Sequence, residues 1–100
     1  WRSGETSIAP RFTILVIDDD DLVLSMVAEL LSAHGHQVLP APRARDGLAL
    51  ARAEHPDLIL VDYHMPEMDG LAVVERLKGD TATRNIPVVA FTSGTSADAN

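Results

Sequence analysis

Short apolar runs alternate with stretches of helical periodicity, and this alternation limits the possible folds more than any other feature. Residues 12–17 form an apolar run with no polar residue after Thr13, and residues 57–62 form another between two aspartates. A strand that is apolar along its whole length has both faces buried, which is typical of parallel sheets. Residues 86–92 form a further apolar run, and residues 36–39 form a weaker one. The sequence therefore predicts four strands.

The stretch after the first run has the spacing of a helix with one apolar face. Residues at positions i, i+3, i+4 and i+7 of this stretch are Val23, Met26, Val27 and Leu30. The pattern predicts that this face is buried. Asp20 or Asp21 can cap the start of the helix by accepting backbone N–H groups. Gly35 can end it, because glycine tolerates the left-handed conformation common after a helix.

Two further helices complete the predicted secondary structure. The second contains Ala44, Leu48 and Ala51 and ends before Pro56. The third follows the capping residue Asp69, and its apolar side is formed by Gly70, Val73, Val74 and Leu77. The predicted order βαβαβαβ favours the α/β class, as a three-layer, doubly wound parallel sheet with helices on both faces.

The composition fits one small globular domain and excludes several classes of function. The chain has 100 residues, of which 46% are hydrophobic and 23% charged. Its formal net charge of −7 disfavours nucleic acid and anionic membrane as direct partners, because both need basic surfaces. The absence of cysteine excludes disulfides, thiol catalysis and cysteine-ligated zinc, and it agrees with a cytoplasmic location.

The two ends of the chain differ in character. Residues 1–10 are mostly polar and lack the apolar core of a signal peptide, so we interpret them as a tail or linker. No apolar run approaches the length of about 20 residues that a membrane-spanning helix needs. Residues 11–100 are therefore predicted to form the folded domain.

Carboxylates stand where the predicted strands end. Asp18 and Asp19 follow the first strand in the segment VIDDDDL, and Asp62 ends the strand at 57–62. Ligands of open parallel sheets bind outside the carboxyl ends of the strands, near the point where strand order reverses. If the first and third strands are neighbours there, three carboxylates converge and repel one another. A divalent cation resolves this repulsion, and Mg²⁺ suits a site with few carboxylates and retained water.

A hydroxyl group ends the fourth predicted strand. Thr92 would then lie near the three carboxylates and could hydrogen-bond a further group. A phosphoryl group that bridges the metal, a carboxylate and this hydroxyl would satisfy all of these residues. Asp20 and Asp21 are instead interpreted as helix caps, because negative charge is favourable at the positive end of the helix dipole.

Three segments resemble the receiver domain of bacterial response regulators. They are ILVIDDDDLV, LILVDYHMPEMDGL and IPVVAFTS, and the pattern D-x-x-M-P-x-M-D-G, which begins at Asp62, is the most specific part. The resemblance covers roughly residues 12–95. It implies a flavodoxin-like sheet with strand order 2-1-3-4-5. It also implies a phosphoacceptor signalling switch of a two-component system, with a sensor histidine kinase or a histidine phosphotransfer protein as partner.

The resemblance assigns a role to each residue of the predicted site. Asp62 would receive the phosphoryl group in a Mg²⁺-dependent reaction, and Asp19 would bind the metal directly. Asp18 would bind it through water, and Asp62 and the backbone carbonyl of His64 would complete the protein ligands. Thr92 would be the switch hydroxyl that moves onto the phosphoryl oxygen. Such a protein is not an enzyme in the usual sense, because it catalyses only its own phosphorylation and dephosphorylation.

One part of the family pattern is missing from this sequence. Receiver domains have a fifth strand that ends in a phosphoryl-binding lysine, followed by a last helix, and this sequence stops at Asn100. Its single lysine, Lys78, falls in the third predicted helix. We therefore interpret the sequence as a receiver truncated before the fifth strand. The fourth strand would then be an apolar edge that invites a homodimer or strand exchange.

Two other functions compete with this interpretation. A phosphatase of the haloacid-dehalogenase type would use Asp18, Asp20 and Thr92, but it would leave the segment DYHMP at residues 62–66 unexplained. Turnover of a phosphomonoester would distinguish it from a receiver. A pseudo-receiver would keep the fold as an interaction domain without being phosphorylated.

Overall fold

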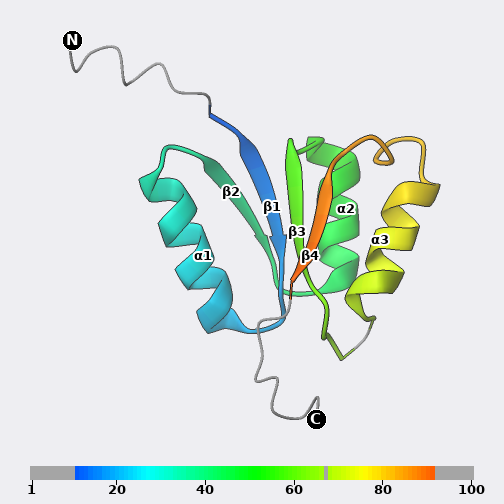
Figure 1. Ribbon diagram of the computed structural model, residues 1–100, viewed down its shortest axis with the longest axis horizontal. Helices are drawn as coiled ribbons and strands as arrows, with labels where there is room; N and C mark the ends of the chain where they lie inside the picture. The colour runs from blue at the N-terminus through cyan, green and yellow to red at the C-terminus, as the bar shows by residue number, and fades with distance from the viewer. Residues whose placement is uncertain (1–10, 67, 92–100) are drawn as a thin grey trace.

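The computed structural model describes residues 11–66 and 68–91, which form one parallel sheet flanked by helices (Figure 1). The strands are β1 (Thr13–Ile17), β2 (Gln37–Ala41), β3 (Leu58–Asp62) and β4 (Val88–Phe91). The helices are α1 (Asp21–Ala33), α2 (Ala44–Glu54) and α3 (Gly70–Gly79). The strand order is β2-β1-β3-β4, which confirms the predicted element order and, for these four strands, the order that the resemblance implies.

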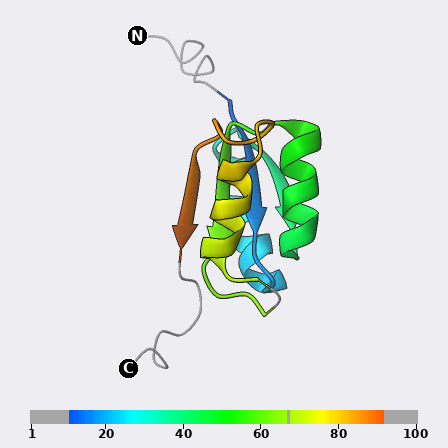
Figure 2. The same ribbon diagram turned by 90° about the vertical axis from the view of Figure 1, so that its right-hand side faces the viewer.

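Helices cover both faces of the sheet, which makes the fold a three-layer one. Helices α2 and α3 lie on one face and α1 lies on the other, over β1 and β2 (Figures 1 and 2). Leu15 and Ile17 of β1 belong to the core under α2 and α3, whereas Ile14 and Val16 belong to the core under α1. All four side chains are buried. Burial on both faces explains why this strand has no alternation of apolar and polar residues.

The helix starts follow the predicted capping chemistry. Of the two candidates for α1, Asp20 is the cap: its Oδ1 accepts the N–H of Leu22 at 2.9 Å. Asp69 caps α3 in the same way, with the N–H of Ala72 donating to its Oδ1 at 2.9 Å. Gly35, just beyond α1, has φ +91°, a conformation that glycine adopts without strain. The predicted ends of α1 are therefore confirmed.

The predicted buried face of α1 is wrong in part. Met26 and Leu30 are 57% and 60% exposed, whereas Leu24, which the prediction left out, is only 7% exposed. Apolar residues cover so much of this helix that periodicity alone does not fix which part of the apolar arc faces the sheet. The position of α1 over β1 and β2 decides it, and that position brings Leu24 into the core.

Two strands differ from their predicted bounds by more than one residue. Strand β2 runs to Ala41 and includes Pro40, because β2 is an edge strand. The N–H of Gln37 and the carbonyl of Ala41 form hydrogen bonds with the β1 side of the sheet. The direction of the backbone groups alternates from one residue to the next, so the backbone nitrogen of Pro40 points away from β1. A proline there loses no ladder bond. Strand β4 begins at Val88, two residues later than predicted, and Thr92 lies outside the described residues.

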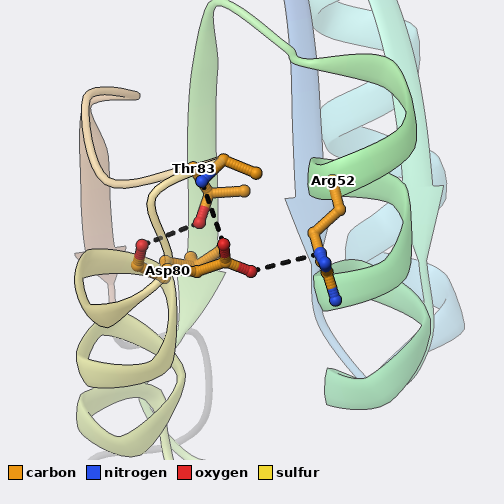
Figure 3. A network of polar contacts seen from close by, with 5 residues as sticks. Arg52, Asp80 and Thr83 are labelled. Carbon is orange, nitrogen blue, oxygen red and sulfur yellow. Dashed lines mark hydrogen bonds and ion pairs between the residues drawn. The ribbon is translucent and has the colours of Figure 1, made fainter.

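A polar network holds the turn between α3 and β4 against α2 (Figure 3). Arg52 Nε of α2 lies 3.1 Å from Asp80 Oδ2, and the Thr83 hydroxyl donates to the carbonyl of Leu77 at 2.7 Å. Lys78 Nζ donates to the carbonyls of Arg84 and Ile86 in the same turn. Because α3 runs antiparallel to the strands, these groups lie at the end of the sheet opposite the carboxyl ends of the strands. Lys78 is therefore remote from the predicted site.

The described helices are short. The longest, α1, has 13 residues. None of the helices in residues 11–66 and 68–91 has both the length and the apolar character needed to cross a membrane.

The burial of α1 generates a prediction from two leucines of the same helix. We expect Leu24→Ala to lower the free energy of unfolding by about 2–4 kcal/mol, because it removes a buried side chain. We expect Leu30→Ala to lower it by less than about 1 kcal/mol, because Leu30 is mostly exposed. Urea unfolding followed by circular dichroism measures both. A larger loss for Leu30→Ala would contradict the orientation of α1.

Candidate functional site

The carboxyl ends of β1 and β3 bring three aspartates together. These strands pair in parallel with Ile17 opposite Val61, so the next residues, Asp18 and Asp62, lie side by side. Asp18 and Asp62 are 0% and 3% exposed, whereas Asp19 is exposed. One carboxylate oxygen from each of the three lies within 4.8 Å of the others. We call Asp18, Asp19 and Asp62 the acidic cluster.

Backbone groups orient the two buried carboxylates. The N–H of Asp20 donates to Asp18 Oδ1 at 2.9 Å, and the N–H of His64 donates to Asp62 Oδ1 at 3.1 Å. Each donor lies two residues after its aspartate, so the turn that follows each strand holds the side chain that ends it. The carboxylates are therefore oriented before any ligand arrives.

Gly70 allows α3 to start directly against the segment that carries Asp62. Its N–H donates to the carbonyl of Tyr63 at 2.8 Å. A Cβ atom at this position would lie 2.7 Å from Tyr63 Cα and 2.8 Å from the Asp62 carbonyl oxygen. These are backbone atoms and cannot rotate away, so only glycine fits without moving the strand end. In the D-G pair, Asp69 thus caps α3, and Gly70 lets the helix start close to the backbone of Asp62 and Tyr63.

The donor set of the acidic cluster fits a hard divalent cation. Three carboxylates this close repel one another, most strongly where burial removes the screening by water. Mg²⁺ prefers carboxylate oxygen and retains part of its water, and the exposed position of Asp19 leaves the cluster open to solvent. Asp18, Asp19 and Asp62 are the described residues that could hold such an ion.

A hollow of about 450 Å³ adjoins the acidic cluster. Asp19 and Asp21 form part of its wall, residues 42–44 form another part, and Met65 and Pro66 complete it. Arg43 is the one basic residue among the described residues of this wall. Arg43 is not among the predicted site residues, although it follows the strand at 37–41 as Asp18 and Asp19 follow the strand at 13–17. Its position directly after a strand was the sequence signal that could have identified Arg43 as a site residue.

The other predicted site residues are placed as follows. His64 is exposed, and its ring meets the ring of Tyr63 edge-on, with centroids 5.1 Å apart. The role of its carbonyl as a metal ligand stays a prediction. Thr92 lies outside the described residues, so its role as the switch hydroxyl also stays a prediction. Asp20 Oδ1 accepts two N–H groups of α1, from Leu22 and Val23, as a helix cap does.

Comparison with known proteins decides the family. The family model "Response regulator receiver domain" matches residues 14–100. The chain belongs to this family. The receiver domain is 41% identical over 80 residues to protein PilH of Pseudomonas aeruginosa, an alignment that covers 80% of this chain and 66% of PilH. It is 37% identical over 81 residues to the polar-differentiation response regulator DivK of Brucella ovis, with 81% and 66% covered. The chain therefore spans slightly less than two thirds of the length of these curated relatives.

Solved structures agree with this assignment. The N-terminal domain of a response regulator receiver protein from Methanoculleus marisnigri aligns with a TM-score of 0.80 and 37% identity, covering 83% of this chain and 68% of that one. The chemotaxis protein CheY4 of Vibrio cholerae aligns with a TM-score of 0.79 and 28% identity, covering 90% and 75%. The flavodoxin-like arrangement predicted for the receiver domain is confirmed.

Membership of the family fixes the class of function. Receiver domains are signalling switches rather than ordinary enzymes, they interact with histidine kinases or phosphotransfer proteins, and they bind Mg²⁺ in an acidic pocket. The haloacid-dehalogenase alternative is set aside, because the family match over residues 14–100 includes Asp18, Asp20 and Thr92, the three residues on which that alternative relied.

Proposed function

We propose that this receiver domain is a phosphoacceptor switch of a two-component system, with Asp62 as the residue that is phosphorylated. The observation that carries the proposal is the position of Asp62. It is a buried carboxylate at the carboxyl end of β3, beside Asp18 and beside Asp19, which lines the adjoining hollow. A sensor histidine kinase or a histidine phosphotransfer protein is the proposed donor, as in the family to which the chain belongs.

The chemistry assigned to Asp62 is a transfer between two side chains. An oxygen of Asp62 bonds to phosphorus while the N–P bond of phosphohistidine breaks, and the leaving imidazole nitrogen keeps the electron pair and takes up a proton. Because Oδ1 of Asp62 accepts the N–H of His64, we assign Oδ2 as the nucleophile. The burial of Asp62 limits the access of water to the product. The domain thereby catalyses only its own phosphorylation and dephosphorylation.

The acidic cluster is the proposed Mg²⁺ site. Asp19 would bind the ion directly, Asp18 through water, and Asp62 and the carbonyl of His64 would complete the protein ligands. When bound, Mg²⁺ offsets the negative charge that the carboxylates and the incoming phosphoryl group share. The proximity of the three carboxylates supports this assignment.

Phosphorylation is proposed to act through a population shift. Thr92 would move onto a phosphoryl oxygen and bias two arrangements of the surface near β4. We also propose residues 11–100 as the extent of the receiver domain, with residues 1–10 as a tail or linker, and the family match over 14–100 supports these bounds. The cytoplasm is the proposed location, because the proposed donors present their phosphohistidine there.

The phosphoacceptor role is tested by the intact mass of the full-length protein. After incubation with Mg²⁺ and phosphoramidate, we expect a gain of one phosphoryl group in the wild type and none in Asp62→Asn. Asp57→Asn is the matched control, because Asp57 immediately precedes β3, at the opposite end of the strand from Asp62, and its carboxylate accepts the N–H of Thr13. It should be phosphorylated like the wild type. An unphosphorylated wild type would indicate a pseudo-receiver that serves as an interaction domain.

The metal site is tested by thermal unfolding with Mg²⁺ and with EDTA. At a Mg²⁺ concentration of about 100 times its Kd, binding stabilises the folded state by about 2.7 kcal/mol, which raises Tm by several degrees. Asp19→Asn should raise Tm in EDTA, because it relieves repulsion, and should remove most of the Mg²⁺ response. Asp69→Asn, which keeps a helix cap outside the acidic cluster, should respond like the wild type. Equal responses in both variants would argue against the site.

The edge strand β4 is the proposed route to a homodimer. None of the residues of Val88–Phe91 is charged, and Val89 is 49% exposed. An edge of this kind pairs readily with another strand. We expect light scattering to show a concentration-dependent dimer that Val89→Lys abolishes, whereas Leu71→Lys, at an exposed leucine of α3, does not. A wild type that stays monomeric at high concentration would exclude this interface.

A further inference from the structure

We propose that Arg43 attracts the anionic phosphodonor to the acidic cluster and is thus a positioning residue for phosphorylation. This inference rests on the proposed phosphoacceptor function and names the residue that governs access to its site. The donor is identified by its chemistry, as a small molecule or side chain that carries a phosphoryl group with negative charge.

The fold places Arg43 beside the acidic cluster. Strands β1 and β2 pair in register with Ile17 opposite Ala41, so the segments that follow them leave the sheet side by side. The N–H of Asp18 donates to the carbonyl of Ala41 at 3.0 Å, which ties the two strand ends together. Arg43 follows two residues later as the N-cap position of α2, and it lines the same hollow as Asp19.

The side chain of Arg43 is available for a ligand. Arg43 is exposed, and it makes no side-chain capping hydrogen bond to α2. No ion pair joins it to any residue in 11–66 or 68–91, in contrast to Arg52, which pairs with Asp80 at 3.1 Å. A guanidinium group offers several N–H donors in a geometry that matches a phosphoryl group.

The distribution of charge makes such a cation favourable at this end of the sheet. Asp20, Asp21 and Asp69 add negative charge around the acidic cluster, and an anionic donor is repelled by all of them. Most of the described basic residues are at the opposite end of the sheet, at the start of β1 or near the C-terminal ends of α2 and α3. They are Arg11, Arg52, Arg76, Lys78 and Arg84.

Two described basic residues remain at the carboxyl ends of the strands, Arg43 and Arg45. Arg45 is exposed in the first turn of α2 but does not line the hollow. It therefore provides a matched control, since its removal changes the net charge equally, two residues away. A local cation raises the encounter rate of an anion with a site, and the effect falls as salt screens the charges.

The experiment follows phosphorylation of the full-length protein by phosphoramidate at a fixed Mg²⁺ concentration. In this reaction an Asp62 oxygen bonds to phosphorus, the P–N bond breaks, and ammonia leaves with a proton from water. The second-order rate constant is measured for the wild type, Arg43→Ala, Arg43→Lys and Arg45→Ala. It is measured in about 0.1 M and about 1 M salt, where the Debye length is about 10 Å and about 3 Å.

We expect Arg43→Ala to lower the second-order rate constant by about threefold or more in the lower salt, with the maximal rate at saturating donor unchanged. The difference should shrink in the higher salt. Arg43→Lys should retain most of the activity, and Arg45→Ala should stay within about twofold of the wild type. Arg43→Ala should also bind Mg²⁺ as tightly as the wild type or more tightly, because it removes a positive charge.

Three results would overturn the inference. Equal rate constants for Arg43→Ala and Arg45→Ala would remove the special role of Arg43. A deficit of the same size in both salt concentrations, or weaker Mg²⁺ binding, would indicate a structural role instead. Failure of the proposed function is distinguishable from all three, because the wild type itself would then not be phosphorylated.

Discussion

The parallel pairing of β1 with β3 is the constraint on which the rest of the site depends. Both strands are packed between helices above and below, so a one-residue shift of register would turn every side chain to the opposite face and disrupt the packing of both cores. With Ile17 fixed opposite Val61, the residues that follow them, Asp18 and Asp62, lie beside each other. The hydrophobic cores therefore provide the energy that holds together groups that repel one another.

Repulsion within the acidic cluster connects the stability of the fold to what binds there. Asp18 and Asp62 are buried and are held by backbone N–H groups, which compensate part of the lost hydration. A cation or a phosphoryl group changes the charge at this point, and the strand ends and the start of α3 meet there. The close approach of Gly70 to Tyr63 places the start of α3 in direct contact with the segment that carries Asp62.

Much of this arrangement was predictable because it follows from local chemistry. Uniformly apolar strands, the caps Asp20 and Asp69, and the strand ends at Asp18 and Asp62 are each visible in a few consecutive residues. The orientation of α1 was not, because its apolar arc is wide and the choice of Leu24 over Leu30 depends on where the helix sits on the sheet. Arg43 was missed for a related reason: an arginine in a loop has no periodic signal, and its meaning comes from the strand pairing that places it beside Asp19.

The two edges of the sheet are not equivalent, and Pro40 is the cause. Its outward position on β2 offers no N–H group, so a strand that approached this edge would find a gap in the ladder of donors. Strand β4 contains no proline and keeps its outer donors. Among the described strands, the edge formed by β4 therefore offers a more complete set of donors to an additional strand than the edge formed by β2.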